Sequence, residues 1–339
     1  MTRLIPLPDD PATHLLSHIA VSDTFSIPLS DAQPQGLVRH GARFHPRGIA
    51  YPAPALVRAV AHHLERPGSI VAEWSALALL GLREFSDSAD TTLLCSSDVR
   101  LSASTRAPTV RRRTKKHQAT DVIVGSFTIP VTPHMDTLAG CLKSLANREH
   151  AWDTLADLDV DAVTVMSVQL IDRFRRVFGA STDQLRIGLK GRFSARRLEK
   201  YLLLSCPLTD SRPETVLRLL AGEAVADLPD VSFVSQVPVY TDGTIGRPGE
   251  KDPDRTLLTV LDQAEPNLLV GLQQDGEHHL ERKQRDKDAE ITADLLANGW
   301  QLVRTSTGML RKTRETKCRV HAATVAALAR REQQRGLAS

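Results

Sequence analysis

Residues 255–276 read RTLLTVLDQAEPNLLVGLQQDG. Two apolar, branched runs separated by Pro266 predict two neighbouring β-strands joined by a turn. The first predicted strand ends on Asp262, and the second presents Gln273 and Asp275. Side chains two positions apart on a strand share one face, so the two strands are expected to form a rigid acidic corner.

Such a corner suits magnesium, which prefers oxygen ligands. We expect Asp262 and Asp275 to share a Mg²⁺ ion, with Glu214 from the preceding predicted helix and His279 from the following turn nearby. Metal-activated water would attack a phosphodiester, and a histidine or a metal-bound water would move protons. Each residue alone has an ordinary explanation: a solvated loop histidine, a turn aspartate, or a glutamate that complements a helix N-terminus.

The chain around this corner is organised as an α/β domain from about 207 to 335. The pattern predicts a helix, three strands, a charged helix, a fourth strand and a final basic helix. Motif residues recur along it: Glu214 at a helix start, Asp262 with Ala264 and Pro266, Gln273 with Asp275, Gly276 and His279, and Gly299, Trp300, Val303 and Arg304.

In these residues the stretch Asp210 to Arg304 resembles the very-short-patch-repair-endonuclease-like domain of unknown function, a branch of the PD-(D/E)xK nuclease superfamily. The resemblance implies a restriction-endonuclease-like three-layer domain with a mixed central sheet. It also implies that Mg²⁺ is the cofactor and that the catalytic positions are Glu214, Asp262, Gln273, Asp275 and His279.

Two positions depart from the pattern of that family. Gln273 stands where the family typically has a glutamate, and Ile291 follows Asp288-Ala289-Glu290 where the family commonly has an arginine. An amide can offer an oxygen to a metal but removes one negative charge from the site. The sequence therefore predicts a weakened or retired nuclease site.

Upstream of 207, the pattern predicts a partly irregular N-terminal element, a small β-rich region at 91–131 and a helical middle. Ser69, Thr132 and Ser194 are candidate helix N-caps. The predicted helices are 54–65, 69–80, 133–145, 149–158, 161–178 and 194–206.

Two stretches, PQGLVRHGARFHPRGIAYPAP at 34–54 and SIVAEWSALALLGL at 69–82, resemble the N-terminal and middle regions of AbiEi-type antitoxin-like proteins of the actinobacterial type. The resemblance implies a degenerate winged-helix-like element at 1–68, an α+β middle domain at 69–148 and a helical connector at 149–206 before the nuclease-like domain at 207–335. It also implies DNA contacts from Arg39, His40, Arg43 and Arg47.

The net charge of +3 permits nucleic-acid contact without demanding it. Local clusters are more informative, because residues 100–116 carry seven basic side chains and no acidic one. They can neutralise phosphates or can blunt a strand edge against aggregation. A second basic segment, 189–202, is equally consistent with a solvated helix face. The DNA-binding candidates from these segments are Arg111, Arg112, Arg113, Lys115, Lys116, Arg196 and Arg197.

The pattern of elements predicts an α+β fold overall, and the composition is that of a globular protein, for which the cytoplasm is the expected location. The four cysteines are far apart, with no pairing that would build a zinc site, and no apolar run reaches the length of a membrane span. Two functions follow: a metal-dependent DNA endonuclease with a weakened site, or a non-catalytic, DNA-binding, antitoxin-like transcriptional regulator. A protein partner in a toxin–antitoxin or defence pair is a third, weaker expectation.

Overall fold

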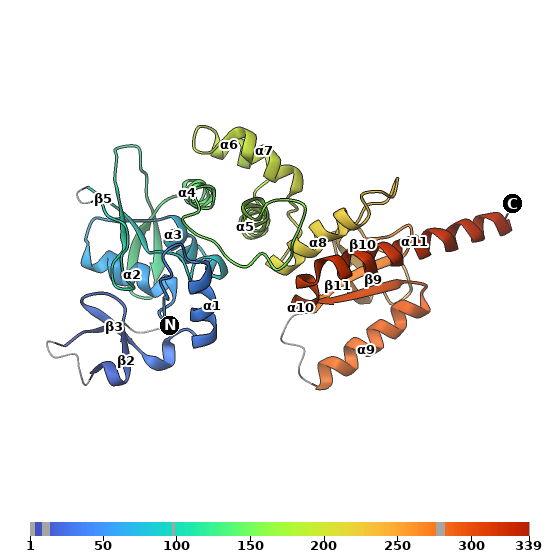
Figure 1. Ribbon diagram of the computed structural model, residues 1–339, viewed down its shortest axis with the longest axis horizontal. Helices are drawn as coiled ribbons and strands as arrows, with labels where there is room; N and C mark the ends of the chain where they lie inside the picture. Colours follow the sequence, from blue (N-terminus) through green and yellow to red (C-terminus); the bar gives the residue numbers. More distant parts are fainter. Residues whose placement is uncertain (1–3, 9–13, 97–98, 276–281, 339) are drawn as a thin grey trace. The chain divides into compact units, whose positions relative to one another are not determined.

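The computed structural model describes residues 4–8, 14–96, 99–275 and 282–338 (Figure 1). The chain forms two compact units: unit 1 is Met1–Asp153 with Ser181–Lys200, and unit 2 is Thr154–Ala180 with Tyr201–Ser339. Both contain helices and sheets, which confirms the predicted α+β class. None of the helices in the described ranges is long and apolar enough to cross a membrane.

Unit 1 contains two sheets. The smaller is antiparallel, in the order β1-β3-β2, and the larger is mixed, in the order β6-β5-β4-β8-β7. The small strands are β1 (Ile5–Pro6), β2 (His18–Ala20) and β3 (Phe25–Pro28), and the larger sheet has β4 (Ile70–Ala72), β5 (Thr92–Cys95), β6 (Thr109–Arg112), β7 (Thr120–Val124) and β8 (Phe127–Val131).

Helices of unit 1 pack on these sheets through small apolar side chains, among them Ala59 and Val60 against Val71. The predicted helices at 54–65 and 133–145 are confirmed. The α-helices are α1 (Gln35–Phe44), α2 (Ala55–Glu65), α3 (Glu73–Leu79), α4 (His134–Ala146), α6 (Thr182–Leu189) and α7 (Ala195–Leu204), which crosses the boundary between the units, and the 3-10 turns are η1 (His14–Leu16), η2 (Leu29–Asp31) and η3 (Arg83–Phe85).

Two predicted helices differ from the structure. The helix expected at 69–80 begins as strand β4, because Ile70–Ala72 is buried and pairs with β5 and β8. The helix expected at 149–158 is wrong, because that segment is not helical. There His150 hydrogen-bonds the Phe85 carbonyl at 2.7 Å, and the rings of His150 and Trp152 pack against Trp74. Tertiary packing of aromatic rings therefore decides this segment.

Unit 2 is built on one mixed sheet in the order β12-β11-β10-β9, in which only β11 and β12 are parallel. The predicted order of helix, three strands, helix and strand is confirmed. Its strands are β9 (Val234–Tyr240), β10 (Leu257–Glu265), β11 (Val270–Asp275) and β12 (Gln301–Ser306), and its helices are α5 (Ala162–Phe178), α8 (Arg212–Ala224), α9 (Arg282–Ala297), α10 (Thr307–Arg311) and α11 (Thr313–Ala338).

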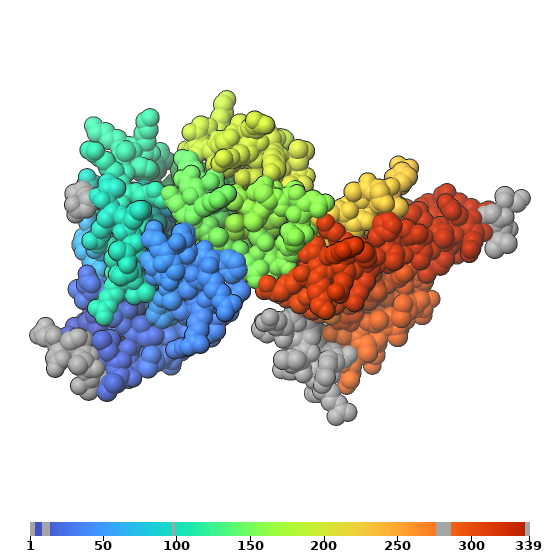
Figure 2. Space-filling model, in the orientation of Figure 1, coloured from blue at the N-terminus to red at the C-terminus, as the bar shows by residue number. Residues whose placement is uncertain are grey.

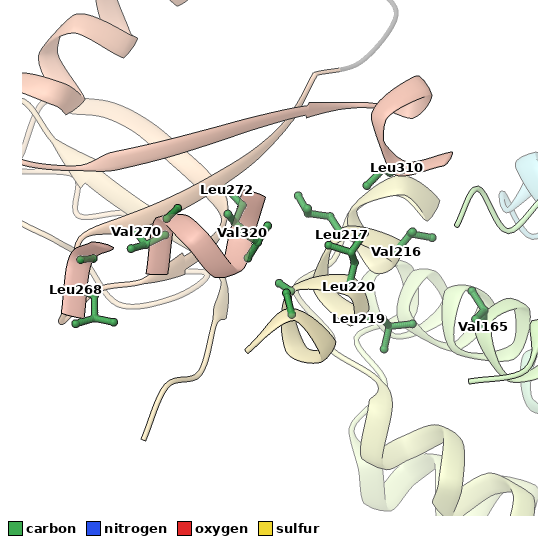
Figure 3. Close-up of a cluster of buried hydrophobic side chains, with 14 residues drawn as sticks. Val165, Val216, Leu217, Leu219, Leu220, Leu268, Val270, Leu272, Leu310 and Val320 are labelled. Atoms are coloured by element: carbon green, nitrogen blue, oxygen red, sulfur yellow. The ribbon is translucent and has the colours of Figure 1, made fainter. Parts of the chain in front are cut away.

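Apolar side chains of the sheet in unit 2 join two hydrophobic clusters. Val270 and Leu272 of β11 pack with Leu220 of α8 and Val320 of α11 (Figure 3). Leu261 of β10 belongs to a second cluster that includes α9. Burial of each such leucine or valine contributes about 1.5–3 kcal/mol, so α8 and the strand ends near it are firmly placed.

Candidate functional site

Asp262 lies where β10 and β11 stop pairing. The ladder between these strands runs from Glu265–Val270 to Gln263–Leu272. Beyond it, Oδ2 of Asp262 accepts a hydrogen bond from the backbone N–H of Gln274 at 2.6 Å. The carboxylate therefore satisfies a donor of the neighbouring strand and is held at the end of the ladder.

Glu214 approaches Asp262 from the start of α8. Ser211 is the N-cap of this helix and its hydroxyl donates to Glu214 Oε1 at 2.8 Å. The backbone N–H of Asp210 donates to Glu214 Oε2 at 3.0 Å. Glu214 thus takes part in helix capping, as the ordinary explanation predicts, while its carboxylate also faces the sheet.

Gln236 of β9 joins the two carboxylates. Its Nε2 donates to Glu214 Oε2 at 3.1 Å and to Asp262 Oδ1 at 3.4 Å. Its backbone lies in the left-handed region, with φ of 57°, which costs a non-glycine residue about 1–3 kcal/mol. Sequence reasoning missed this residue, because a single glutamine in a strand gives no signal of its own.

Both carboxylates are destabilised in their charged forms. Burial and, after it, the charges of Glu214 and Asp275 raise the pKa of Asp262 to about 7, although the hydrogen bonds from Gln274 and Gln236 lower it. Burial is also the main cause that raises the pKa of Glu214. The hydrogen-bond donors to these two neighbouring acids are all neutral among the described residues, although the charge of Arg173 lowers the pKa of Glu214. Such a pair of acids makes a place where a cation would be stabilised.

Asp275 is differently engaged. Nε of Arg304 donates to Asp275 Oδ2 at 3.1 Å, and Nη2 donates to Oδ1 at 2.6 Å. The same guanidinium lies 3.6 Å from Asp288 of α9 and bonds the hydroxyl of Thr292. Asp275 is close enough to Asp262 to affect its pKa, but both of its oxygens hold Arg304.

Gln273 is half-buried in β11, where it stands in register with Arg304 of β12. Its carbonyl accepts from the Thr305 hydroxyl at 3.2 Å. His279 and Gly276, two other predicted site positions, lie outside the described residues. Among the residues that are described, no three His, Cys, Asp or Glu side chains converge as a metal-binding group.

The donor set around Glu214 and Asp262 nevertheless fits magnesium. This ion is commonly bound through one or two carboxylates while it keeps several waters, and it requires no complete cage of protein ligands. Glu214 and Asp262 supply two carboxylates from different elements, and Gln236 adds an amide whose oxygen accepts no hydrogen bond among the described residues. The two carboxylates that face each other are therefore Glu214 and Asp262, whereas the sequence paired Asp262 with Asp275.

The predicted DNA-binding residues of unit 1 fall into two groups. Arg111 bonds Glu73 at 2.9 Å and Glu149 at 2.7 Å, and Arg47 is paired with Asp90. His40 lies 3.8 Å from Asp153. The others are exposed and form no ion pair within the described ranges: Arg39, Arg43, Arg112, Arg113, Lys115, Lys116, Arg196 and Arg197.

Comparisons with known proteins add no relative: the chain matches no protein-family model, no curated protein and no solved structure.

Proposed function

We propose that this chain is a DNA-associated protein of the PD-(D/E)xK nuclease superfamily, in its very-short-patch-repair-like branch, and that Glu214 and Asp262 bind Mg²⁺. Unit 2 is then a restriction-endonuclease-like three-layer domain, with α8 and α11 on one face of its mixed sheet and α9 on the other. The order of its elements and the motif residues from Glu214 to Arg304 support this assignment.

One observation carries the proposal. Glu214 and Asp262 lie on either side of one amide, accept hydrogen bonds only from neutral groups among the described residues, and resist ionisation as neighbours. Bound Mg²⁺ supplies a water of lowered pKa and an electrophile for a phosphodiester. In this chain Glu214 and Asp262 hold the cation, Gln236 orients their oxygens, and Arg304 keeps Asp275 neutralised beside them.

Calorimetric titration with Mg²⁺ and with Mn²⁺ tests the site. Asp262→Asn keeps the shape of the side chain and removes its charge, so we expect it to abolish measurable binding. Asp254→Asn changes an exposed acid of the same unit and is expected to bind as the unchanged protein does. Absence of binding in the unchanged protein, or equal binding by Asp262→Asn, would refute the proposed site.

Hydrolysis is the second step of the test. We expect slow, Mn²⁺- or Mg²⁺-dependent cleavage of duplex or single-stranded DNA that is lost in Asp262→Asn. Gln273→Glu restores the charge expected by the family pattern and should increase cleavage, because one further carboxylate strengthens cation binding. Cleavage that persists in Asp262→Asn would place the activity elsewhere.

A second function is favoured by the bidentate Arg304–Asp275 pair. If that pair and the neutral side chain of Gln273 together abolish catalysis, the chain is a non-catalytic, antitoxin-like DNA-binding regulator. It would then use the nuclease fold as a scaffold. It would bind DNA with strong salt dependence and cleave none under any metal condition, even as Gln273→Glu. A protein partner in a toxin–antitoxin or defence pair is compatible with this function.

A further inference from the structure

A cavity of about 280 Å³ in unit 1 is lined by none of the residues of the proposed metal site. Three segments wall it: the turn 66–69 after α2, the end of β5 at Cys95 and Ser96, and a short antiparallel bridge between Arg100 and Val110. The turn includes Gly68, whose φ of 83° lets the chain reverse tightly between α2 and β4. The cavity is thus lined by residues of three separate segments of the chain.

Arginines from two of these segments line the cavity. Arg66 forms an ion pair with Glu65 at 3.1 Å, whereas Arg100 is exposed and makes no ion pair within the described part of the chain. A third, Arg113, donates to the carbonyl of Gly68 at 3.1 Å and so lies on the lining turn.

The remaining arginines of β6 lie on opposite faces of the strand. Val110 lines the cavity, and Arg112, two positions further along, lies on the same strand face beside Cys95, its partner in register. Arg111 between them points to the opposite face, where Glu73 and Glu149 neutralise it. The alternation of side chains along β6 therefore places Arg112, which forms no ion pair among the described residues, on the face of the cavity. It places Arg111, which is ion-paired, on the opposite face.

Arg66 and Arg100 line the cavity, and Arg112 and Arg113 lie beside its lining residues Cys95 and Gly68. None of the described lining residues is acidic, and Glu65 is the ion-pair partner of Arg66. The basic segment continues along the chain with Lys115 and Lys116, both exposed. In Figure 2 the teal segment that carries it lies at the surface. Guanidinium groups match the geometry of phosphate oxygens, and the serines at 69 and 96 add polar lining.

We propose that this cavity binds a phosphate group of a nucleic-acid strand, and that segment 112–116 follows the adjoining backbone. The inference rests on the DNA association of the proposed function and adds a contact that neither sequence motif assigns. Blunting of a strand edge accounts for exposed lysines, but it does not account for arginines from the turn after α2, from the bridge and from β6 around one cavity.

Fluorescence anisotropy of a short labelled oligonucleotide, with and without a 5′-phosphate and over a range of salt, tests the contact. Arg100→Gln should weaken binding about tenfold and lower the slope of log affinity against log salt by about one. Arg66→Gln should weaken binding in the same direction. Arg106→Gln is the matched control, because Arg106 is exposed in the same basic segment and does not line the cavity.

The outcomes separate this inference from the proposed function. Competition by inorganic phosphate or a mononucleotide, lost in Arg100→Gln, supports the cavity as the phosphate site. DNA binding that falls equally in Arg100→Gln and Arg106→Gln, or in neither, overturns the cavity and leaves the DNA association intact. Binding of phosphate or mononucleotide without oligonucleotide binding overturns the nucleic-acid ligand. If none of these probes binds, both the phosphate cavity and the DNA association are overturned. The cation titration of unit 2 then still tests Glu214 and Asp262 as metal ligands.

Discussion

A single neutral amide lies between two acids of unit 2. Gln236 donates one NH₂ group to both Glu214 and Asp262, and a neutral amide does not offset their negative charges. A proton on Asp262 relieves that repulsion, and so would a cation. Protons and divalent ions are therefore expected to compete for the same oxygens.

This competition gives the free protein a pH dependence. The pKa of Asp262 rises from 3.8 to about 7 on folding, so the folded state holds its proton more tightly than the unfolded state does. The resulting stabilisation is complete below about pH 4 and is lost as the pH rises to about 7. In the unchanged protein the free energy of unfolding should therefore fall by on the order of 3 kcal/mol between pH 5 and pH 8. Asp262→Asn has no carboxylate at this position, so its free energy of unfolding should lack this fall.

Urea unfolding at the two pH values measures that difference without added metal. Asp254→Asn, which alters an exposed acid, should show the same pH dependence as the unchanged protein. Asp262→Asn and Asp254→Asn with identical pH dependence would contradict the assignment of a raised pKa to Asp262.

The sequence located part of this site and missed the rest for identifiable reasons. Glu214 and Asp262 could be predicted, because a capped helix start and an acid at a strand end leave local patterns. The role of Gln236 depends on a left-handed backbone position, and the pairing of Asp275 with Arg304 depends on the parallel register of β11 and β12. Neither the backbone conformation of Gln236 nor the register of β11 and β12 can be predicted from the spacing of nearby residues in the sequence.

At the scale of helices and strands, α5 and α8 are joined by a buried polar network. Asp172 of α5 is fully buried and accepts from Arg218 at 2.7 Å, from the Thr215 hydroxyl at 2.9 Å and from the backbone N–H of Cys206 at 2.7 Å. Because α8 also carries Glu214, this network fixes the helix that presents one of the two site carboxylates.

Loss of the charge of Asp172 should destabilise unit 2. Asp172→Asn leaves Arg218 without its counter-charge in a buried setting, which typically costs about 3–5 kcal/mol. Chemical unfolding is expected to show this loss, and Asp294→Asn on the exposed side of α9 is expected to change stability by less than about 0.5 kcal/mol. A loss below about 1 kcal/mol for Asp172→Asn would mean that the network does not hold α8 in place.

Prediction of the elements themselves succeeded where periodicity and end signals agreed. The strands of unit 2 are bounded by turns and were predicted in order. The short strand Ile70–Ala72 leads directly into α3 at Glu73, so no turn residue marks the change. Helix α6 was missed, although Ser181 and Gln184 form a capping box that could have revealed it.

At the scale of the whole molecule, the positions of the charged side chains are more informative about DNA binding than the net charge is. Within the basic segment of unit 1, Arg111 forms ion pairs with two acids, whereas Lys115 and Lys116 are exposed and unpaired among the described residues. Neighbours in sequence therefore serve different ends, one stabilising the unit and the others free to meet a polyanion.

This difference can be measured. The double change Lys115→Gln with Lys116→Gln should lower the salt slope of DNA binding by about two and leave unfolding unchanged, because each lost phosphate contact removes about one counterion. Arg111→Gln should do the opposite and reduce stability by about 1–3 kcal/mol, since Glu73 would lose its counter-charge and keep only the hydrogen bond from the Thr92 hydroxyl among the described residues. Equal effects of the two variants on DNA affinity would contradict this division of roles.

The interleaving of the two units along the chain has a consequence for synthesis. Helix α5 belongs to unit 2 but precedes the last segment of unit 1, 181–200. As the chain emerges from the ribosome, Val165 and Asp172 must therefore wait for α8 and its partners before they are covered. A fragment that begins at residue 207 would lack them altogether, so an isolated, stable unit 2 is expected only when the chain segment from 154 is supplied as well.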